Sequence, residues 1–221
     1  MPLIEALEAL FASHAHVHNA QQMAAYMKQV SPYIGLKKPL RAQLQKQVFA
    51  QYPIADEQQL IAYVHRLWSK TEREYQYAAL DLLLAHKKLW SPHLFELFEQ
   101  LVAIKPWWDT IDTLAVNCVG ALIQKYPALQ VHMDRWITDP LFWKRRVALL
   151  YQLRYKQKTD TKILARYCTQ TMHEREFFIA KAIGWALREY SKTDPTWVRA
   201  FLTHHADQLA RLSMREAGKY C

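Results

Sequence analysis

The prolines of this chain lie between its helix-like segments, and this placement constrains the fold. Prolines 53, 92, 106, 127, 140 and 195 fall between segments with helical periodicity, and Pro39 opens another such segment. Proline is tolerated in the first turn of a helix but disrupts its interior. No segment shows sustained alternation of apolar and polar residues. The pattern therefore predicts helices joined at the prolines, and no strands.

Glycine usage supports the same fold class. Only four of the 221 residues are glycine, so few turns that need a positive φ can be built. Asp56 has the residue type and position of a helix N-cap. The predicted helices span residues 3–14, 19–30, 39–51, 56–67, 71–86, 91–104, 107–125, 127–137, 140–157, 159–171, 174–190 and 195–210.

Several of these segments resemble one another. Residues 79–83, 147–150 and 181–187 have similar apolar sequences, and tryptophans recur at positions 68, 108, 143 and 185. A spacing near 40 residues is typical of HEAT or armadillo repeats, which stack into an α-solenoid with a concave binding face. We therefore predict an all-α, HEAT-like helical-repeat solenoid, with residues 1–221 forming a single domain.

Positive charge gathers in the second half of the chain. The net charge is +9, and residues 111–221 carry 18 Lys and Arg against 10 Asp and Glu. Residues 135–166 contain nine basic residues and only two acidic ones, Asp139 and Asp160. Such a basic region indicates a polyanion partner on a basic concave face, or else a solvated surface without a partner.

Cysteine and histidine patterns favour no metal or disulfide chemistry. The three cysteines are far apart and form no C-x-x-C pair, which is typical of a protein in a reducing compartment. His14, His16 and His18 diverge on a helix, so we predict no metal site and no cofactor. The first residues lack a signal-peptide pattern, and no apolar run is long enough to cross a membrane. We therefore expect a soluble, cytoplasmic protein that makes no membrane contact.

Residues 105–112 place two tryptophans beside two carboxylates at a predicted helix start. Trp108 and Asp112 are four residues apart, so they share one helix face. An aromatic surface next to an anion suits a cationic, sugar-like transition state held against nucleic acid. We predict that Trp107 is a packing residue and that Asp109 is a favourable charge in the first helical turn.

Two further segments leave alternatives open. Lys144, Arg145 and Arg146 begin a predicted helix, where the helix dipole disfavours cations, and either a phosphate resolves the conflict or they are surface charges. Gly184 interrupts a helix before Trp185, so a neighbouring helix or a ligand must approach the backbone there. The pair Glu72 and Glu74 is predicted to be surface charge rather than a catalytic dyad.

Longer motifs carry a family resemblance. Residues 107–112 (WWDTID), 143–148 (WKRRVA) and 177–190 (FFIAKAIGWALREY) are similar to segments of the AlkD-like DNA alkylation-repair glycosylases. Supporting similarities at residues 25–28, 35–39, 73–81 and 213–217 extend the resemblance in one register from about residue 20 to about residue 217.

The resemblance implies a HEAT-like solenoid that removes N3- and N7-alkylated purines from duplex DNA. The catalytic acid of the family falls on Asp112, its active-site tryptophans on Trp108 and Trp185, its cleft arginine on Arg146 and its DNA-contacting tyrosine on Tyr26. This sequence departs from the family pattern by being more basic at Lys38, Lys144 and Arg145, and we expect these residues to strengthen the phosphate contacts. We also predict DNA contacts for Lys181 and Arg188.

The chemistry of the residues agrees with this implied function. A 7-alkylpurine is cationic and leaves readily, while the developing charge on the sugar can be stabilised by one ionised carboxylate and two tryptophan faces. We expect a monomeric, monofunctional glycosylase that needs no obligate protein partner and acts at the nucleoid. The alternatives are a non-catalytic DNA-binding paralogue on the same scaffold, and a helical-repeat scaffold for an acidic protein.

Overall fold

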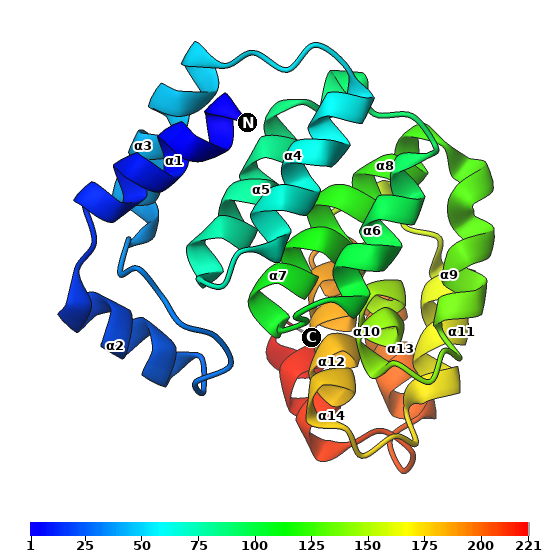
Figure 1. Ribbon diagram of the computed structural model, residues 1–221. Helices are drawn as coiled ribbons and strands as arrows, with labels where there is room; N and C mark the ends of the chain where they lie inside the picture. Colours follow the sequence, from blue (N-terminus) through cyan, green and yellow to red (C-terminus); the bar gives the residue numbers. More distant parts are fainter. Residues whose placement is uncertain (221) are drawn as a thin grey trace. The chain divides into compact units, whose positions relative to one another are not determined.

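The computed structural model describes residues 1–220 of the chain. These residues form helices joined by short connections, with no strand among them (Figure 1). The predicted all-α class is therefore confirmed. Close contacts group into two compact units, one of residues 1–94 and one from residue 95 onward. The expectation of a single domain stays a prediction.

The first unit holds five α-helices. They are α1 (Pro2–Ser13), α2 (Val17–Tyr26), α3 (Lys38–Gln51), α4 (Glu57–Ser69) and α5 (Arg73–Ala85), followed by the short 3-10 helix η1 (Lys87–Leu89). In Figure 1, α1 lies beside α3, and α4 lies beside α5. The fully buried Leu3, Leu7 and Phe11 repeat every four residues on α1 and form its core-facing side. Asp56 caps α4 as predicted, since its Oδ1 accepts the Gln59 backbone N–H at 2.8 Å.

Glu74 corrects one prediction within this unit. It is fully buried rather than a surface charge. Its carboxylate accepts the backbone N–H groups of Ile34, Gly35 and Leu36 at 3.0, 2.8 and 3.1 Å. Gly35 has a φ of +97°, and a Cβ there would lie 2.2 Å from the His16 carbonyl oxygen. Glu74 therefore fixes the connection between α2 and α3, where backbone donors would otherwise be unsatisfied.

The second unit contains the remaining helices. They are α6 (Leu94–Ala103), α7 (Trp108–Thr113), the π-helix η2 (Leu114–Val119), α8 (Gly120–Lys125), η3 (Pro127–Leu129), α9 (Gln130–Trp136), α10 (Phe142–Leu150), η4 (Lys156–Lys158), α11 (Thr161–Thr171), α12 (Phe177–Ser191), α13 (Pro195–His204), α14 (Arg211–Ala217) and η5 (Gly218–Tyr220). Helix α10 packs against α7 and η2 and also against α12, which in turn packs against α14. This succession of packed helices positions the candidate site.

Helices α7, η2 and α8 form one segment, as predicted for residues 107–125. Its middle part is a π-helix, a departure from α-helical winding that is frequent at functional sites. Gly120 allows a close approach at the end of this stretch, because a Cβ there would lie 2.2 Å from the carbonyl oxygen of Tyr151. The π-helix begins two residues after Asp112.

The helix predicted over residues 19–30 ends early, at Tyr26, because Lys28 and Gln29 have positive φ values of 59° and 58°.

Two other predicted helices also end more than one turn early in the structure. The helix predicted over residues 140–157 ends at Leu150, and the one predicted over 195–210 ends at His204. After α10, the Gln152 side chain accepts the Asp160 backbone N–H at 2.8 Å, which closes a turn that helical continuation would not allow. Helix α14 was not predicted, because seven residues are too few to show a convincing period.

The described residues also bear on the membrane and metal predictions. None of the helices within residues 1–220 has the length and apolarity needed to cross a bilayer. Among the same residues, no three His, Cys, Asp or Glu side chains are grouped as a metal ion would require.

Candidate active site

Asp112 and Arg146 form a two-pronged ion pair between α7 and α10. The Arg146 Nε donates to Asp112 Oδ1 at 2.8 Å, and Nη2 donates to Oδ2 at 2.9 Å. A fork of this kind fixes the plane of the carboxylate as well as its position. The structure thus brings together two residues that are 34 positions apart and that the sequence singled out separately.

Arg146 is held on every side by protein. Its Nη1 donates to the Phe178 carbonyl oxygen at 2.5 Å, and its guanidinium lies 5.2 Å from the ring centroid of Trp185. The side chain is only 1% exposed, so a direct phosphate contact would need Arg146 to be uncovered. Its role as a phosphate contact stays a prediction, while the contact that the structure shows is the ion pair with Asp112.

Asp112 is mostly buried but reaches solvent. Its side chain is 21% exposed, and burial raises the pKa of its carboxyl group. The hydrogen bonds and charge of Arg146 oppose that rise, while the nearby charge of Asp109 adds to it. Arg146 uses one acceptor position on each carboxylate oxygen, which leaves acceptor positions for a water molecule or a substrate.

An aromatic cluster lies beside Arg146, whose guanidinium is 5.7 Å from the ring centroid of Phe178. Trp107 lies 5.3 Å from Phe178 and 5.9 Å from Trp143, and Trp143 lies 4.8 Å from Phe178, all between ring centroids. The predicted packing role of Trp107 is therefore confirmed. Asp109 stands in the first turn of α7, as predicted, where its Oδ1 accepts the Thr110 backbone N–H at 2.8 Å.

The two predicted active-site tryptophans lie on different helices. Trp108 is the first residue of α7, one turn before Asp112, and it is partly exposed. Trp185 lies on α12 and is also partly exposed. Arg146, Lys181 and Arg188 lie 5.2, 5.8 and 5.9 Å from the Trp185 ring centroid. Any cationic substrate group would share this ring with cations of the protein.

Carboxylates of the protein pair with the cations at the start of α10. Lys144 Nζ lies 2.7 Å from Glu99 Oε1 and 3.2 Å from Asp139 Oδ2. Arg145 Nη2 lies 2.8 Å from Glu174 Oε2. The basic stretch is thus compensated by acids from distant parts of the chain. Contact of Lys144 and Arg145 with DNA stays a prediction.

Gly184 admits a neighbouring helix, which answers the question left open by the sequence. A Cβ at this position would lie 2.6 Å from the Cβ of Glu216 and 3.1 Å from the Ser213 carbonyl oxygen. Helix α14 therefore packs directly on α12. This packing places the carboxylate of Glu216 in ion pairs with Lys181 and Arg188. Sequence reasoning did not assign a role to Glu216, although it lies in one of the motifs that carried the resemblance.

Tyr26 and Lys38 belong to the first unit. Tyr26 is the last residue of α2, Lys38 is the first of α3, and both are exposed. Exposure is what a DNA contact needs, and their contacts stay predictions. Phe178 is a site residue that sequence reasoning missed, because its contribution to Arg146 is a backbone carbonyl oxygen, which no side-chain pattern reveals.

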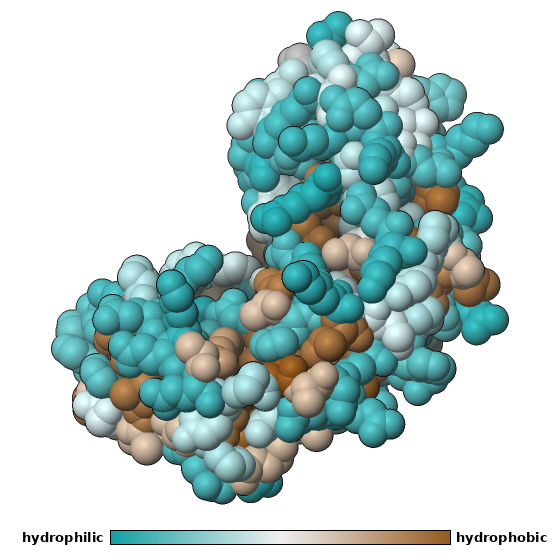
Figure 2. All heavy atoms as spheres, turned by 90° about the horizontal axis from the view of Figure 1, so that it is seen from above, coloured by the Kyte–Doolittle hydropathy of each residue, from teal (hydrophilic) through white to brown (hydrophobic). Residues whose placement is uncertain are grey.

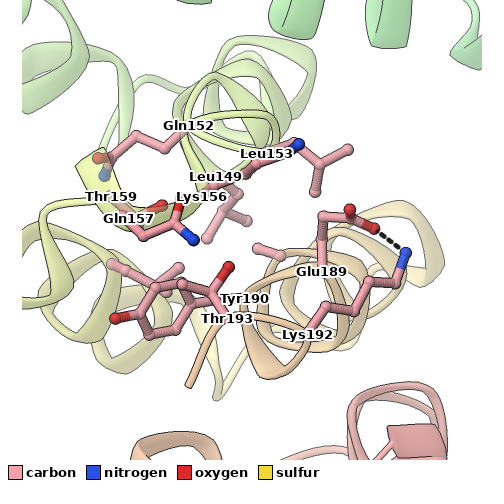
Figure 3. Close-up of a pocket in the computed structure, with 12 residues that line it drawn as sticks. Leu149, Gln152, Leu153, Lys156, Gln157, Thr159, Glu189, Tyr190, Lys192 and Thr193 are labelled. Carbon is pink, nitrogen blue, oxygen red and sulfur yellow. Dashed lines mark hydrogen bonds and ion pairs between the residues drawn. The ribbon is translucent and has the colours of Figure 1, made fainter. Parts of the chain in front are cut away.

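A cavity of about 420 Å³ lies elsewhere in the second unit, beyond the C-terminal part of α10 (Figure 3). None of Asp112, Arg146 and Trp185 lines it. Its lining Glu189 and Lys192 pair with each other at 2.6 Å. The surface seen in Figure 2 is mostly hydrophilic, with hydrophobic residues in smaller areas. A polar ligand suits such a surface better than an apolar one.

The fold and site define a class of protein. It is a helical-repeat protein in which a partly exposed carboxylate, fixed by a buried arginine, lies among cations and tryptophans. The chain belongs to the DNA alkylation repair enzyme family, because the family model matches residues 7–221. The protein is thus a member of an enzyme family that repairs alkylated DNA.

Solved structures agree with this assignment. A predicted DNA alkylation repair enzyme from Enterococcus faecalis is 35% identical, covers 92% of this chain and 94% of its own, and has a TM-score of 0.84. The smu.31 protein from Streptococcus mutans UA159 is 16% identical over 91% of this chain and 98% of its own, with a TM-score of 0.63. The second likeness shows the fold alone. No curated protein matches the chain significantly.

Proposed function

We propose that this chain is a monofunctional DNA glycosylase that hydrolyses the N-glycosidic bond of N3- and N7-alkylated purines in duplex DNA. The family provides the role in alkylation repair. The observation that carries the finer proposal is the carboxylate of Asp112, fixed by two hydrogen bonds from Arg146 and still 21% exposed. An oriented anion that solvent can reach suits a reaction with a cationic transition state.

The reaction begins from a base that already carries a positive charge. When the bond between the sugar C1′ and the purine nitrogen breaks, its electron pair goes to the base, which leaves as a neutral molecule. The positive charge then spreads over C1′ and the ring oxygen of the deoxyribose. Water adds to C1′ and loses one proton, which gives an abasic site and the free base. No redox step and no cofactor is needed.

Asp112 acts on the sugar and on the water. Its ionised carboxylate stabilises the developing charge at C1′ and accepts a hydrogen bond from the attacking water. Because burial raises the pKa of Asp112, this carboxylate is a stronger base than an exposed aspartate. Arg146 is a positioning residue in this scheme, because it keeps the carboxylate plane fixed before and during the reaction.

The tryptophans and cations hold the DNA. Trp108, one turn before Asp112, packs against the deoxyribose, and Trp185 forms the opposite wall together with its surrounding cations. Lys181 and Arg188 contact phosphates beside the alkylated nucleotide. Further contacts with the DNA backbone come from the side chains of Tyr26, Lys38, Lys144 and Arg145. The protein acts as a monomer on duplex DNA at the nucleoid, without an obligate protein partner.

A base-release assay tests this function. Wild-type protein is incubated with a duplex that contains 7-methylguanine, and the free base is measured against the spontaneous rate. We expect accelerated release, with a DNA strand that breaks only after alkali treatment, since a monofunctional glycosylase leaves the abasic site intact. An unmodified duplex is the control. Release at the spontaneous rate, with binding preserved, would identify a non-catalytic DNA-binding protein instead.

A further inference from the structure

Glu216 is a buried carboxylate with three cationic partners and no part in the proposed chemistry. Its Oε1 accepts from Lys181 Nζ at 3.1 Å. Its Oε2 accepts from Arg188 Nη1 at 2.9 Å and from Lys219 Nζ at 3.0 Å. The Glu216 side chain is 6% exposed. A buried carboxylate is costly unless it is paired, so these contacts define its place.

The backbone beneath Glu216 is fixed. Gly184 lets α14 approach α12 so closely that an added Cβ would lie 2.6 Å from the Glu216 Cβ. One turn before Glu216, the buried Ser213 Oγ donates to the Ala180 carbonyl oxygen at 2.8 Å. In Figure 1, α12 and α14 lie side by side over this stretch. The carboxylate is therefore presented from a rigid support rather than from a flexible surface.

The cations that Glu216 holds flank Trp185. Lys181 precedes Trp185 by four residues and Arg188 follows it by three, so all three share one face of α12. The charged groups lie 5.8 and 5.9 Å from the Trp185 ring centroid. Their side chains are 24% and 27% exposed, so both cations reach solvent while Glu216 lies beneath them.

The charges of this cluster do not cancel. One carboxylate faces three cations, which leaves the cluster positive and attractive to an anion. Hydrogen bonds from Lys219 and Lys181 lower the pKa of Glu216 to about 2, so it stays ionised at any pH at which DNA is repaired. The permanent negative charge of Glu216 weakens the attraction of this cluster for DNA. Any gain in DNA binding from Glu216 must therefore come from the positions in which it holds Lys181 and Arg188.

We propose that Glu216 is a positioning residue that holds Lys181 and Arg188 on either side of Trp185 as a clamp for the phosphates next to the alkylated nucleotide. This inference rests on the proposed function in taking DNA as the ligand. Long cationic side chains lose conformational freedom when they bind a phosphate, and that loss weakens binding. A clamp that is ordered before DNA arrives avoids part of this loss.

Equilibrium binding to an undamaged duplex, followed by fluorescence anisotropy, tests the clamp. Glu216→Gln removes the carboxylate charge, and we expect its affinity to be about tenfold weaker although the protein becomes more positive. The matched control is Glu189→Gln, which makes the same charge change on α12, the helix that carries Lys181 and Arg188, where Glu189 pairs with Lys192 (Figure 3). Its affinity should be unchanged or slightly tighter. Equal or tighter binding by Glu216→Gln would overturn the proposal.

A double-mutant cycle separates positioning from packing. In the Lys181→Met/Arg188→Met background, Glu216→Gln should change the affinity by less than about twofold, because no clamp is left to position. The Lys181→Met/Arg188→Met variant should depend less on salt than the wild type. The negative slope of log affinity against log salt should become smaller in magnitude by about two, because one phosphate contact is lost for each cation. A tenfold loss in both backgrounds would show that Glu216 only supports the packing of α14, and would contradict the proposal.

A second variant and a binding readout separate the clamp from the proposed reaction. If Glu216→Gln does not fold, Glu216→Asp takes its place with Glu189→Asp as its control. The same tenfold loss is expected, because the carboxylate keeps its charge but is withdrawn by one methylene. The readout needs no base release, so a clamp that is confirmed in a protein without glycosylase activity would overturn only the proposed reaction. Wild-type protein that does not bind duplex DNA would overturn the proposed function together with the clamp.

Discussion

Replacing Arg146 by methionine should damage both the stability and the pH dependence of this protein. The substitution keeps an apolar side chain under the aromatic cluster but removes both hydrogen bonds to Asp112 and the one to the Phe178 carbonyl oxygen. Asp112 is then left as a mostly buried carboxylate without its counter-ion. Breaking a buried ion pair from one side costs about 3–5 kcal/mol.

The structure places the expected cost near the lower end of that range. Water still reaches the Asp112 side chain, which is 21% exposed, so we expect a loss of about 3 kcal/mol in the free energy of unfolding. For a domain of this size such a loss lowers the melting temperature by about 6–12 °C. A carboxylate that is no longer held in place should also slow base release by about tenfold or more.

The pH dependence has a defined sign. Burial already raises the pKa of Asp112, and Arg146 is the group that opposes the rise. A carboxyl group whose pKa is raised on folding disfavours the folded state as the pH increases through that pKa. Without Arg146 the pKa rises further, so the stability deficit of the variant should be largest at neutral pH and smaller in mild acid.

Two assays measure the effects of Arg146→Met. Thermal unfolding across pH reports the stability deficit, and single-turnover base release across pH reports the acid limb, which should move to higher pH in Arg146→Met. Arg145→Met is the control for the position of the acid limb, which should not move in this variant, because Arg145 is adjacent but pairs with Glu174 rather than Asp112. An acid limb that stays in place, or a deficit that grows on acidification, would refute the reasoning.

Other predictions concern the supports of the fold and can be checked by chemical denaturation. Gly184→Ala should lower the free energy of unfolding by about 1–2 kcal/mol, since overpacking against Glu216 outweighs the better helix propensity of alanine; an unchanged or higher stability would contradict the close approach. Glu74→Gln should lower it by about 2–3 kcal/mol, because an amide oxygen cannot replace a carboxylate that accepts three backbone N–H groups; a neutral effect would mean that the connection between α2 and α3 is held otherwise.

Much of the fold could be predicted from local sequence signals. Prolines and periodicity indicated the helices, and Asp56 indicated a cap, because these features act within a few residues. Helix α14 was missed because it is too short to show a period. The end of α10 at Leu150 was missed because it depends on a tertiary contact between Gln152 and Asp160.

The candidate site was predictable only in part, for a related reason. Trp107 and Asp109 lie within one helical turn, so their roles followed from position. The partners of Lys144 and Arg145 are Glu99 and Glu174, which lie 45 and 29 residues away, so the sequence suggested an uncompensated basic patch. Such pairings depend on the packing of helices, which no local pattern specifies.

The burial of Arg146 changes the interpretation of the basic residues. The sequence left Arg146 as either a phosphate contact or a surface charge, whereas the structure shows it paired with the carboxylate on which the proposed chemistry depends. The positive charges nearest to solvent around Trp185 are instead Lys181 and Arg188. The protein thus separates an inner cation that orients Asp112 from outer cations proposed to contact DNA.

The most direct test of the central claim compares two aspartates on α7. Asp112→Asn keeps the shape of the side chain but removes its charge, and Asp109→Asn makes the same change three residues earlier. In single-turnover assays on a duplex that contains 7-methylguanine, Asp112→Asn should release the base at least about tenfold more slowly than wild type, while Asp109→Asn should stay within about threefold. Equal rates for wild type and Asp112→Asn would contradict the account.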